Sequence, residues 1–345
     1  MGVYSFFIII LSIASVVELV VYNKRKDVIS FFYVLIAISF VAIGGFTEGN
    51  GLDWYAYQSI SQEKISINDI WNHSQYEPLF LLLYDSFPTF HVFLFVFVCL
   101  NFILLSKTII SNSPYVIISI FIYVCVYYFL GIMGQLRQAL AISLIVFSWP
   151  YIKSKKIIFF VLLASLFHYS AIICLLYYCV PNRLFKKHVY LCVLLFICFT
   201  FEYFQSLLLT ALENFSYGKV LLYVNIEDGG ISTVFILYKL FVFFLFLYRI
   251  DRCVTNLPKY KIVNIYFLSI ILYLILSFSS SIGGRIILYF TMFEILIIPF
   301  IINSYSRMIK RLLISILFIM INVYQYFSFL YSFSDTFIPY KFLFL

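Results

Sequence analysis

Apolar runs of about 17 to 25 residues recur along the whole sequence, separated by short polar or charged segments. A run of this length, folded as an α-helix, crosses the hydrocarbon core of a bilayer. The first run covers residues 3–22 and the last ends near residue 331. No polar segment is long enough to form a soluble domain. The sequence therefore predicts an all-α polytopic membrane protein, with residues 1–345 forming a single integral membrane domain.

Composition supports the same class and excludes several functions. Hydrophobic residues make up 64% of the chain and charged residues 11%, with a mean hydropathy of +1.04, whereas soluble domains carry roughly 25% charged residues. The net charge of +8 would suit nucleic acid in a soluble protein, but here the basic residues lie between apolar runs, as the positive-inside rule requires. The seven cysteines show no metal-ligand spacing, so we interpret them as small hydrophobic residues. We expect no nucleic-acid partner, no metal and no cofactor.

Basic clusters orient the predicted helices. Placing these clusters in the cytoplasm puts both termini outside and predicts about ten full transmembrane helices, with outer loops at residues 47–77 and 213–231. One run conflicts with this alternation, because Ile157–Val180 has basic residues at both ends. A re-entrant hairpin of two short helices resolves the conflict and puts His168 near its turn.

Two arginines lie at the predicted outer boundary of the membrane. Arg137 follows GIMGQL and Arg285 follows SSSIGG, so we predict that each follows a short turn and opens an inward helix. Helix N-termini attract anions and arginine binds phosphate through two hydrogen bonds; the alternative is an arginine that anchors its helix among lipid headgroups. His168 lies about 12 residues, or some 18 Å, beyond Lys156. This reach lets His168 share a cavity with Arg137, although a buried histidine is often only a structural hydrogen-bond partner.

Other polar residues are weaker candidates. Asp53, Tyr57 and Glu77 in the first outer loop could bind sugar hydroxyls, or belong to an ordinary solvated loop. Charged residues inside apolar runs form ion pairs within the bundle or, as the alternative, a proton relay. These residues are Glu18, Glu202, Lys239 and Glu294.

Five short motifs occur in order along most of the chain. They are GLDWYAY at residues 51–57, Glu77-Pro78, GQLRQALA at 134–141, LFHYSAI at 166–172 and GGRIILYF at 283–290. Together they resemble the EpsG/Wzy-type membrane polysaccharide polymerases, which include the O-antigen polymerases.

The resemblance implies a fold similar to the C-type glycosyltransferases and a polymerase on the outer face of a bacterial inner membrane. Such an enzyme transfers a glycan from undecaprenyl diphosphate to the non-reducing end of another carrier-linked repeat unit, as in O-antigen or capsular polysaccharide. We expect Arg137 and Arg285 to hold the diphosphate and His168 to deprotonate or orient the acceptor hydroxyl, with Asp53 or Glu77 as the rival base. A single displacement would invert the anomeric carbon without a metal. The residues expected to contact substrate are Asp53, Tyr57, Glu77, Gln138, Lys239 and Tyr289.

Two other functions use similar features. A lipid-linked oligosaccharide flippase would also need intramembrane cations, and Lys239 fits that alternative best. A glycan ligase or acyltransferase is the third possibility. The candidate site residues cluster on one face of the membrane, and the sequence has no obvious internal repeat of the kind common in transporters. Both observations favour the polymerase. Its partners would be the two lipid-linked oligosaccharides, membrane lipid and a chain-length regulator protein.

Overall fold

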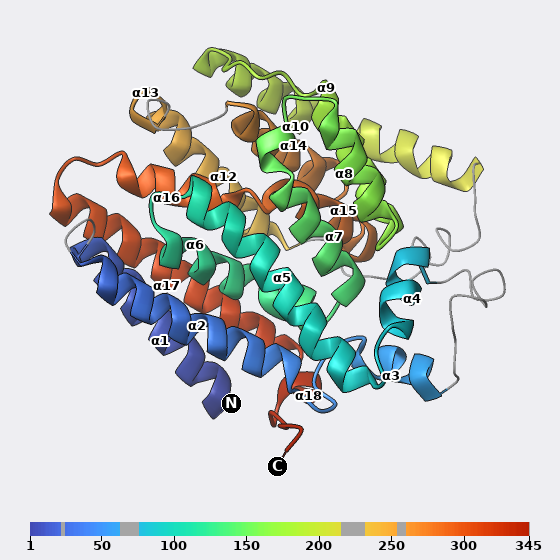
Figure 1. Cartoon of the computed structure of the whole chain (residues 1–345). Coiled ribbons are helices and arrows are strands. Elements are labelled where there is room, and N and C mark those ends of the chain that lie inside the picture. The colour runs from blue at the N-terminus through green and yellow to red at the C-terminus, as the bar shows by residue number, and fades with distance from the viewer. Residues whose placement is uncertain (22–24, 63–75, 215–231, 254–259, 345) are drawn as a thin grey trace.

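The computed structural model describes every residue except 22–24, 63–75, 215–231, 254–259 and 345. The gaps include most of the predicted outer loop 213–231 and part of loop 47–77, which therefore lie outside the described residues. The described part of the chain is helical, as predicted (Figure 1). In this part, five helices are long and apolar enough to cross a membrane. They are α1 (Gly2–Val21), α2 (Lys26–Gly45), α5 (Phe90–Asn112), α10 (Lys187–Asn214) and α17 (Met308–Ser332).

The described residues do not support the predicted number of ten full spans. Among the described residues there are five full-length candidates, or six if the bent pair α15 (Ser280–Thr291) and α16 (Glu294–Asn303) crosses once. The remaining apolar helices have 10–17 residues, fewer than the roughly 20 that a full span needs. These shorter helices are α6 (Val116–Tyr123) continued by η2 (Val124–Ile132), α7 (Leu136–Phe147), α8 (Lys156–Ser165), η4 (Tyr169–Leu175) continued by α9 (Leu176–Cys179), α12 (Thr233–Tyr248) and α14 (Lys261–Ile275). Small helical segments complete the set: α3 (Trp54–Gln62), α4 (Pro78–Asp85), η3 (Trp149–Tyr151), α13 (Ile250–Cys253) and α18 (Ser334–Phe337).

Backbone interruptions explain the difference. Hydropathy treats each apolar run as one helix, but α7 stops before Pro150, which lacks the N–H needed to continue it. Residues 124–132 wind as a π-helix, a form that occurs in short local stretches. α15 and α16 meet at a bend of 42°. Hydropathy alone detects none of these breaks.

The predicted turn at residues 279–284 is also wrong. Helix α15 begins at Ser280, so Arg285 lies in its second turn and does not open the helix. Serine and glycine favour turns in isolation, but here the backbone is already helical, and Gly283 N donates to Ser279 O at 3.0 Å. Arg137, in contrast, is the second residue of α7, as predicted.

The segment between the two basic clusters folds as the predicted hairpin. α8 ends at Ser165, the helix breaks, and η4 packs back against α8. The two ends of the segment meet at Lys261, whose Nζ donates to the carbonyl of Ile152 at 3.1 Å and to that of Tyr178 at 3.5 Å. His168 therefore lies at the break, at the opposite end of the hairpin from the basic residues.

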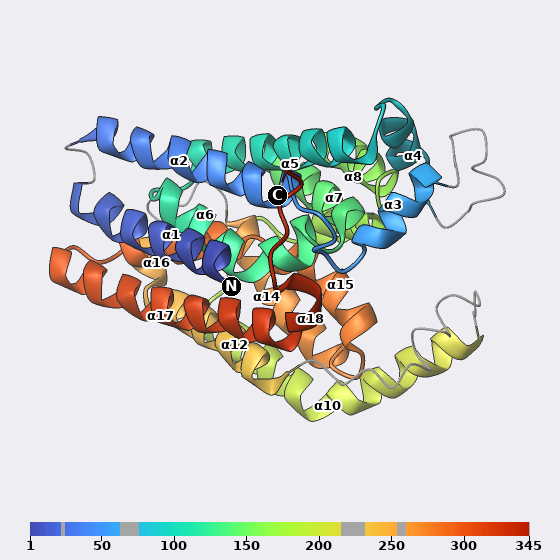
Figure 2. The same cartoon turned by 90° about the horizontal axis from the view of Figure 1, so that it is seen from below.

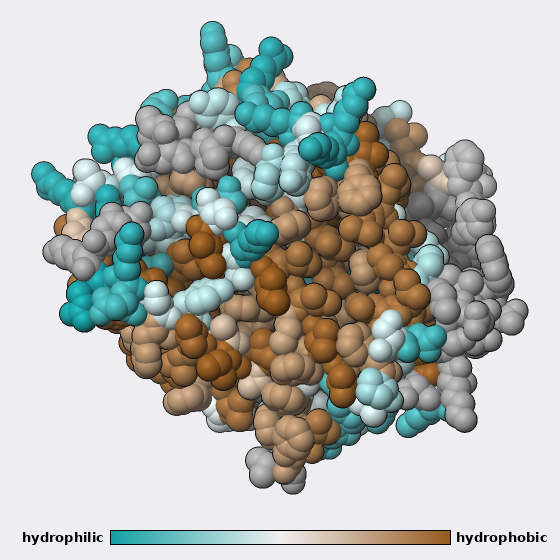
Figure 3. Space-filling model, in the orientation of Figure 1, coloured by the Kyte–Doolittle hydropathy of each residue, from teal (hydrophilic) through white to brown (hydrophobic). Residues whose placement is uncertain are grey.

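The bundle has two unlike ends. Both termini lie at one end, near α18 (Figure 1), and Glu48 N donates to Lys341 O at 3.0 Å, which ties the C-terminal segment to the start of the first predicted outer loop. α1 lies between α2 and α17 (Figure 2). Hydrophobic side chains cross the middle of the face in Figure 3, while hydrophilic ones gather along its upper and left edge. This arrangement fits a bundle whose middle faces lipid.

The hairpin makes a testable prediction about sidedness. Cysteines introduced at Ser154 and Asn182 flank the hairpin, and both should react with a membrane-impermeant reagent from the same side, the cytoplasm. The measurement needs a background without the exposed native cysteines Cys179, Cys192 and Cys198. Labelling of the two positions from opposite sides would make the segment one ordinary span.

Candidate active site

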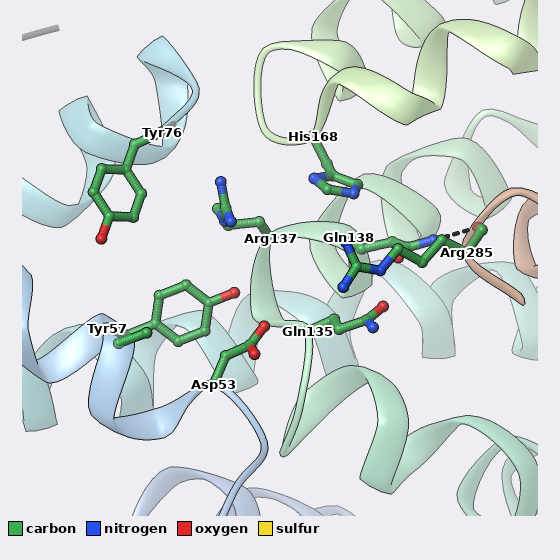
Figure 4. A pocket seen from close by; sticks show the side chains of 9 residues that line it. Asp53, Tyr57, Tyr76, Gln135, Arg137, Gln138, His168 and Arg285 are labelled. Atoms are coloured by element: carbon green, nitrogen blue, oxygen red, sulfur yellow. Dashed lines mark hydrogen bonds between the residues drawn. The ribbon is translucent and has the colours of Figure 1, made fainter. Parts of the chain in front are cut away.

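A cavity of about 380 Å³ collects most of the residues singled out from the sequence (Figure 4). The elements that line it lie toward the end of the bundle that holds the termini (Figure 1). Its walls come from α3 and the loop before it, the start of α7, the break in the hairpin and α15. The lining residues are Asp53, Ala56, Tyr57, Tyr76, Gln135, Arg137, Gln138, His168 and Arg285. Arg137 and His168 thus share one cavity, as the hairpin predicted.

A glycine-dependent contact places Asp53 beside the start of α7. Leu52 N donates to Met133 O at 3.2 Å, so the two loops run against each other. Gly51 has a φ of +154°, and a Cβ there would lie 2.3 Å from Met133 O. Any larger residue at this position would push the loops apart. The glycine of GLDWYAY therefore positions the aspartate two residues later.

Glu77 joins the hairpin to the start of α7. Its carboxylate accepts from Arg137 Nη1 at 2.6 Å, lies 3.1 Å from His168 Nδ1 and accepts from Tyr169 N at 3.3 Å. Leu79 N also donates to Leu166 O at 3.1 Å, which fixes the hairpin break against α4. The Glu77 side chain is only 3% exposed. One buried carboxylate thus holds both an arginine and a histidine in place.

The protonation of Glu77 determines which histidine nitrogen is free. Burial alone would raise the pKa of Glu77, but the hydrogen bond from His168 and the charge of Arg137 outweigh burial and lower it. An ionised carboxylate can only accept, so Nδ1 of His168 must carry the proton. In the neutral ring Nε2 is then unprotonated and can accept a proton. Glu77 is consequently better suited to orient the base than to be the base.

Aromatic rings hold the Arg137 guanidinium from the other sides. Its Cζ lies 5.4 Å from the ring centre of Tyr76, 5.7 Å from that of Phe80 and 5.9 Å from that of Tyr57. Cation–π contacts at these distances restrain the planar group. A guanidinium fixed in this way presents a preorganised positive charge to the cavity.

Asp53 is the carboxylate on the cavity wall itself. Burial raises the pKa of Asp53, although the charges of Arg285, Arg137 and His168 partly offset that effect. In Figure 4 the side chains of Asp53 and Gln135 lie on one side of the cavity and His168 on the other. The cavity therefore combines cations with hydrogen-bond acceptors.

Three predicted contact residues do not line the cavity: Glu77, which lies behind Arg137 and His168, and Lys239 and Tyr289, which lie elsewhere. Lys239 is fully buried and forms an ion pair with Glu294, which also accepts from Tyr266 OH at 3.0 Å. The hydroxyl of Tyr289 lies 3.1 Å from that of Ser170 and does not line the cavity. Lys239 therefore forms an ion pair within the bundle, which was one of the two predicted alternatives.

The other charged residues of apolar runs differ from each other. Glu18 is buried and accepts from the backbone N–H groups of Ile117 and Ile118, where it caps the start of α6. Glu202 is exposed on α10. Gln135 and Tyr76 also line the cavity, and neither was predicted as a site residue. Only their positions in the sequence could have identified them, because Gln135 directly precedes the helix that carries Arg137 and Tyr76 directly precedes Glu77.

The family comparison covers nearly the whole chain. The model of the EpsG family matches residues 29–342, which include every lining residue of the cavity. No curated protein and no solved structure matches the chain. With more than half of its length matched, the chain belongs to the EpsG family of polysaccharide polymerase-type membrane proteins.

Proposed function

We propose that this protein transfers a growing glycan from a polyprenyl diphosphate to a hydroxyl at the non-reducing end of another carrier-linked repeat unit. The observation that carries the proposal is the cavity in which Arg137, Arg285 and the Glu77-bound His168 converge. A diphosphate leaving group needs fixed positive charge, and an acceptor hydroxyl needs a base. The cavity holds both kinds of group.

The reaction can be written with each atom accounted for. His168 Nε2 takes the proton of the acceptor hydroxyl as the hydroxyl oxygen attacks the anomeric carbon. The bond from that carbon to the diphosphate oxygen breaks, and the diphosphate leaves with the electron pair beside Arg137 and Arg285. Glu77 stabilises the imidazolium that forms. One displacement of this kind inverts the configuration of the anomeric carbon.

Asp53 remains the rival base. It faces the cavity directly, and its raised pKa suits proton transfer closer to neutral pH than an ordinary aspartate. His168 is preferred because its partner Glu77 fixes the ring and its tautomer. Substitution can separate the two, since loss of the base abolishes chain growth while loss of an accessory acceptor weakens it.

The location of the cavity supports activity on the outer face. If the basic clusters predicted from the sequence face the cytoplasm, the cavity and both termini, which lie toward the other end of the bundle (Figure 1), would face the outside of an inner membrane. The flippase alternative depended mainly on an intramembrane cation at Lys239. That cation is neutralised by Glu294, so the polymerase accounts for more of the charged residues.

Reconstitution of the full chain tests the proposal. Purified protein in liposomes, given a lipid-linked repeat unit, should produce a ladder of longer glycans. Arg137→Lys and Arg285→Lys should each slow ladder formation about 10- to 100-fold, because lysine keeps the charge but loses the planar fork. Arg25→Lys is the matched control, since Arg25 lies at the opposite end and pairs with exposed Asp27 at 2.8 Å. A normal ladder from both cavity variants would exclude the diphosphate role.

A further inference from the structure

Gln138 has one half of its amide fixed and the other half without a partner. Its Nε2 donates to the backbone carbonyl of Arg285, which joins α7 to α15. A flipped amide would place two acceptor oxygens against each other, so this bond determines the orientation of the group. Gln138 is 1% exposed, and within the described residues its Oε1 is buried without a hydrogen-bond donor. A buried acceptor of this kind is costly unless a ligand completes it.

A second acceptor lies on the same side of the helix start. Gln135 is three residues before Gln138, a spacing that puts two side chains on one face. Its Oε1 is likewise buried without a partner among the described residues, and the residue lines the same cavity. Together with the Asp53 carboxylate, the two amide oxygens form a wall of acceptors. Phosphate oxygens are also acceptors, so this wall suits a ligand that donates hydrogen bonds.

The position of Gln138 limits which donor can reach it. Its amide is bonded to the backbone of Arg285, and it directly follows Arg137 in α7. If the two arginines hold the diphosphate, the nearest part of the substrate is the sugar attached to that diphosphate. At the anomeric carbon of this sugar, one neighbour is the ring oxygen, which has no hydrogen to donate. The other neighbour is C2, whose hydroxyl or acetamido N–H is a donor.

We infer that Gln138 Oε1 accepts a hydrogen bond from the C2 substituent of the donor sugar, with Gln135 Oε1 completing the subsite. This inference rests on the proposed function. A hydrogen bond at C2 strengthens as positive charge develops at the neighbouring anomeric carbon, so it favours the transition state. Gln138 would thereby help to determine which first sugar is accepted by the enzyme.

The test is a comparison of two substrates on two proteins. The natural probe is the carrier-linked repeat unit isolated from cells whose polymerase carries Arg137→Lys, and the second probe is its synthetic counterpart with hydrogen at C2 of the first sugar. Reconstituted wild-type protein should prefer the natural unit by about tenfold to 100-fold in kcat/KM. Gln138→Met should reduce that preference to within about twofold, because the acceptor assigned to the C2 substituent is lost.

Control variants separate recognition from structure. Gln138→Met also loses the bond to Arg285, but a structural defect slows both substrates equally and leaves their ratio unchanged. Gln205→Met is the matched control, because the Gln205 amide also donates to a backbone carbonyl, that of Leu274 at 3.0 Å, but lies outside the cavity.

The outcomes also distinguish a failure of the proposed Gln138 subsite from a failure of the proposed polymerase function. If wild-type protein does not elongate the isolated repeat unit, the proposed function fails. If it elongates the unit but shows no preference for the C2 substituent, or if Gln138→Met keeps the wild-type preference, the subsite is wrong and the polymerase proposal stands.

Discussion

Glu77→Gln is expected to lower the rate of chain growth about 100- to 10,000-fold, the range associated with loss of a correctly poised general base. The glutamine oxygen can still accept from the charged Arg137, which leaves the NH₂ group facing His168 Nδ1 and the N–H of Tyr169. That NH₂ group donates, so Nδ1 must become the acceptor and the neutral ring must carry its proton on Nε2. The nitrogen proposed to take the acceptor proton is then blocked.

The measurement is the initial rate of ladder formation by reconstituted protein, with equal amounts of folded enzyme confirmed by thermal melting. Glu48→Gln is the matched control. Glu48 also pairs with a histidine, His91, at 2.7 Å, but its side chain is 39% exposed and outside this cavity. The control should retain wild-type activity. A Glu77→Gln enzyme within a few-fold of wild type would rule out the orienting role and favour Asp53 as the base.

The lowered pKa of Glu77 also predicts in which direction the stability of the protein changes with pH. A carboxyl group with a lower pKa in the folded protein stabilises the fold at pH above its unfolded value, here near 4.5, and loses that contribution as pH falls through the folded value. The difference in melting temperature between wild type and Glu77→Gln should therefore be constant from pH 6 to 8 and shrink only below about pH 4.5. A difference that grows on acidification would contradict the assigned ion pair.

The sequence predicted the structure best in the hairpin, where the basic residues at both ends of one apolar run could be explained in only one way. Basic residues at both ends of Ile157–Val180 required the chain to turn back, and the hairpin places His168 on the same cavity as Arg137. The link that fixes this geometry was not recognised, because Glu77 lies 60 residues from Arg137 and 91 from His168. A single sequence contains no signal for such pairings beyond the type of residue.

The prediction of ten spans lacks support among the described residues for a different reason. Hydropathy reports whether a residue tolerates lipid and does not report where a helix is interrupted. The π-helical turn at residues 124–132 and the bend between α15 and α16 both lie inside continuous apolar sequence. Likewise the small residues before Arg285 fit a turn or a helix equally well in the sequence, and the structure has them in the first turn of α15. Similarity to the C-type glycosyltransferase fold stays a prediction.

Lys239→Met is expected to lower the free energy of unfolding by about 3–5 kcal/mol, because it leaves Glu294 as an unpaired buried charge. Both side chains are almost completely buried, at 1% and 0% exposure. Glu294 is the first residue of α16, at the bend that follows α15. The pair therefore ties α12 to the bend, and α15 carries Arg285 into the cavity. The single variant should lose polymer formation together with stability.

A double variant separates the effect of the buried charge on stability from the effect of packing. Lys239→Met combined with Glu294→Gln removes both charges, and the glutamine oxygen can still accept from Tyr266 OH. Stability should return close to the wild-type value, since a buried ion pair and a well-packed neutral pair are often nearly equivalent. Lys187→Met provides the comparison on the surface, where Lys187 and Asp251 lie 3.6 Å apart at 47% and 87% exposure; it should cost no more than about 1 kcal/mol. Denaturant titration in mixed micelles measures all three variants. If the double variant is as unstable as Lys239→Met alone, the loss comes from packing around residue 239 and not from the uncompensated carboxylate.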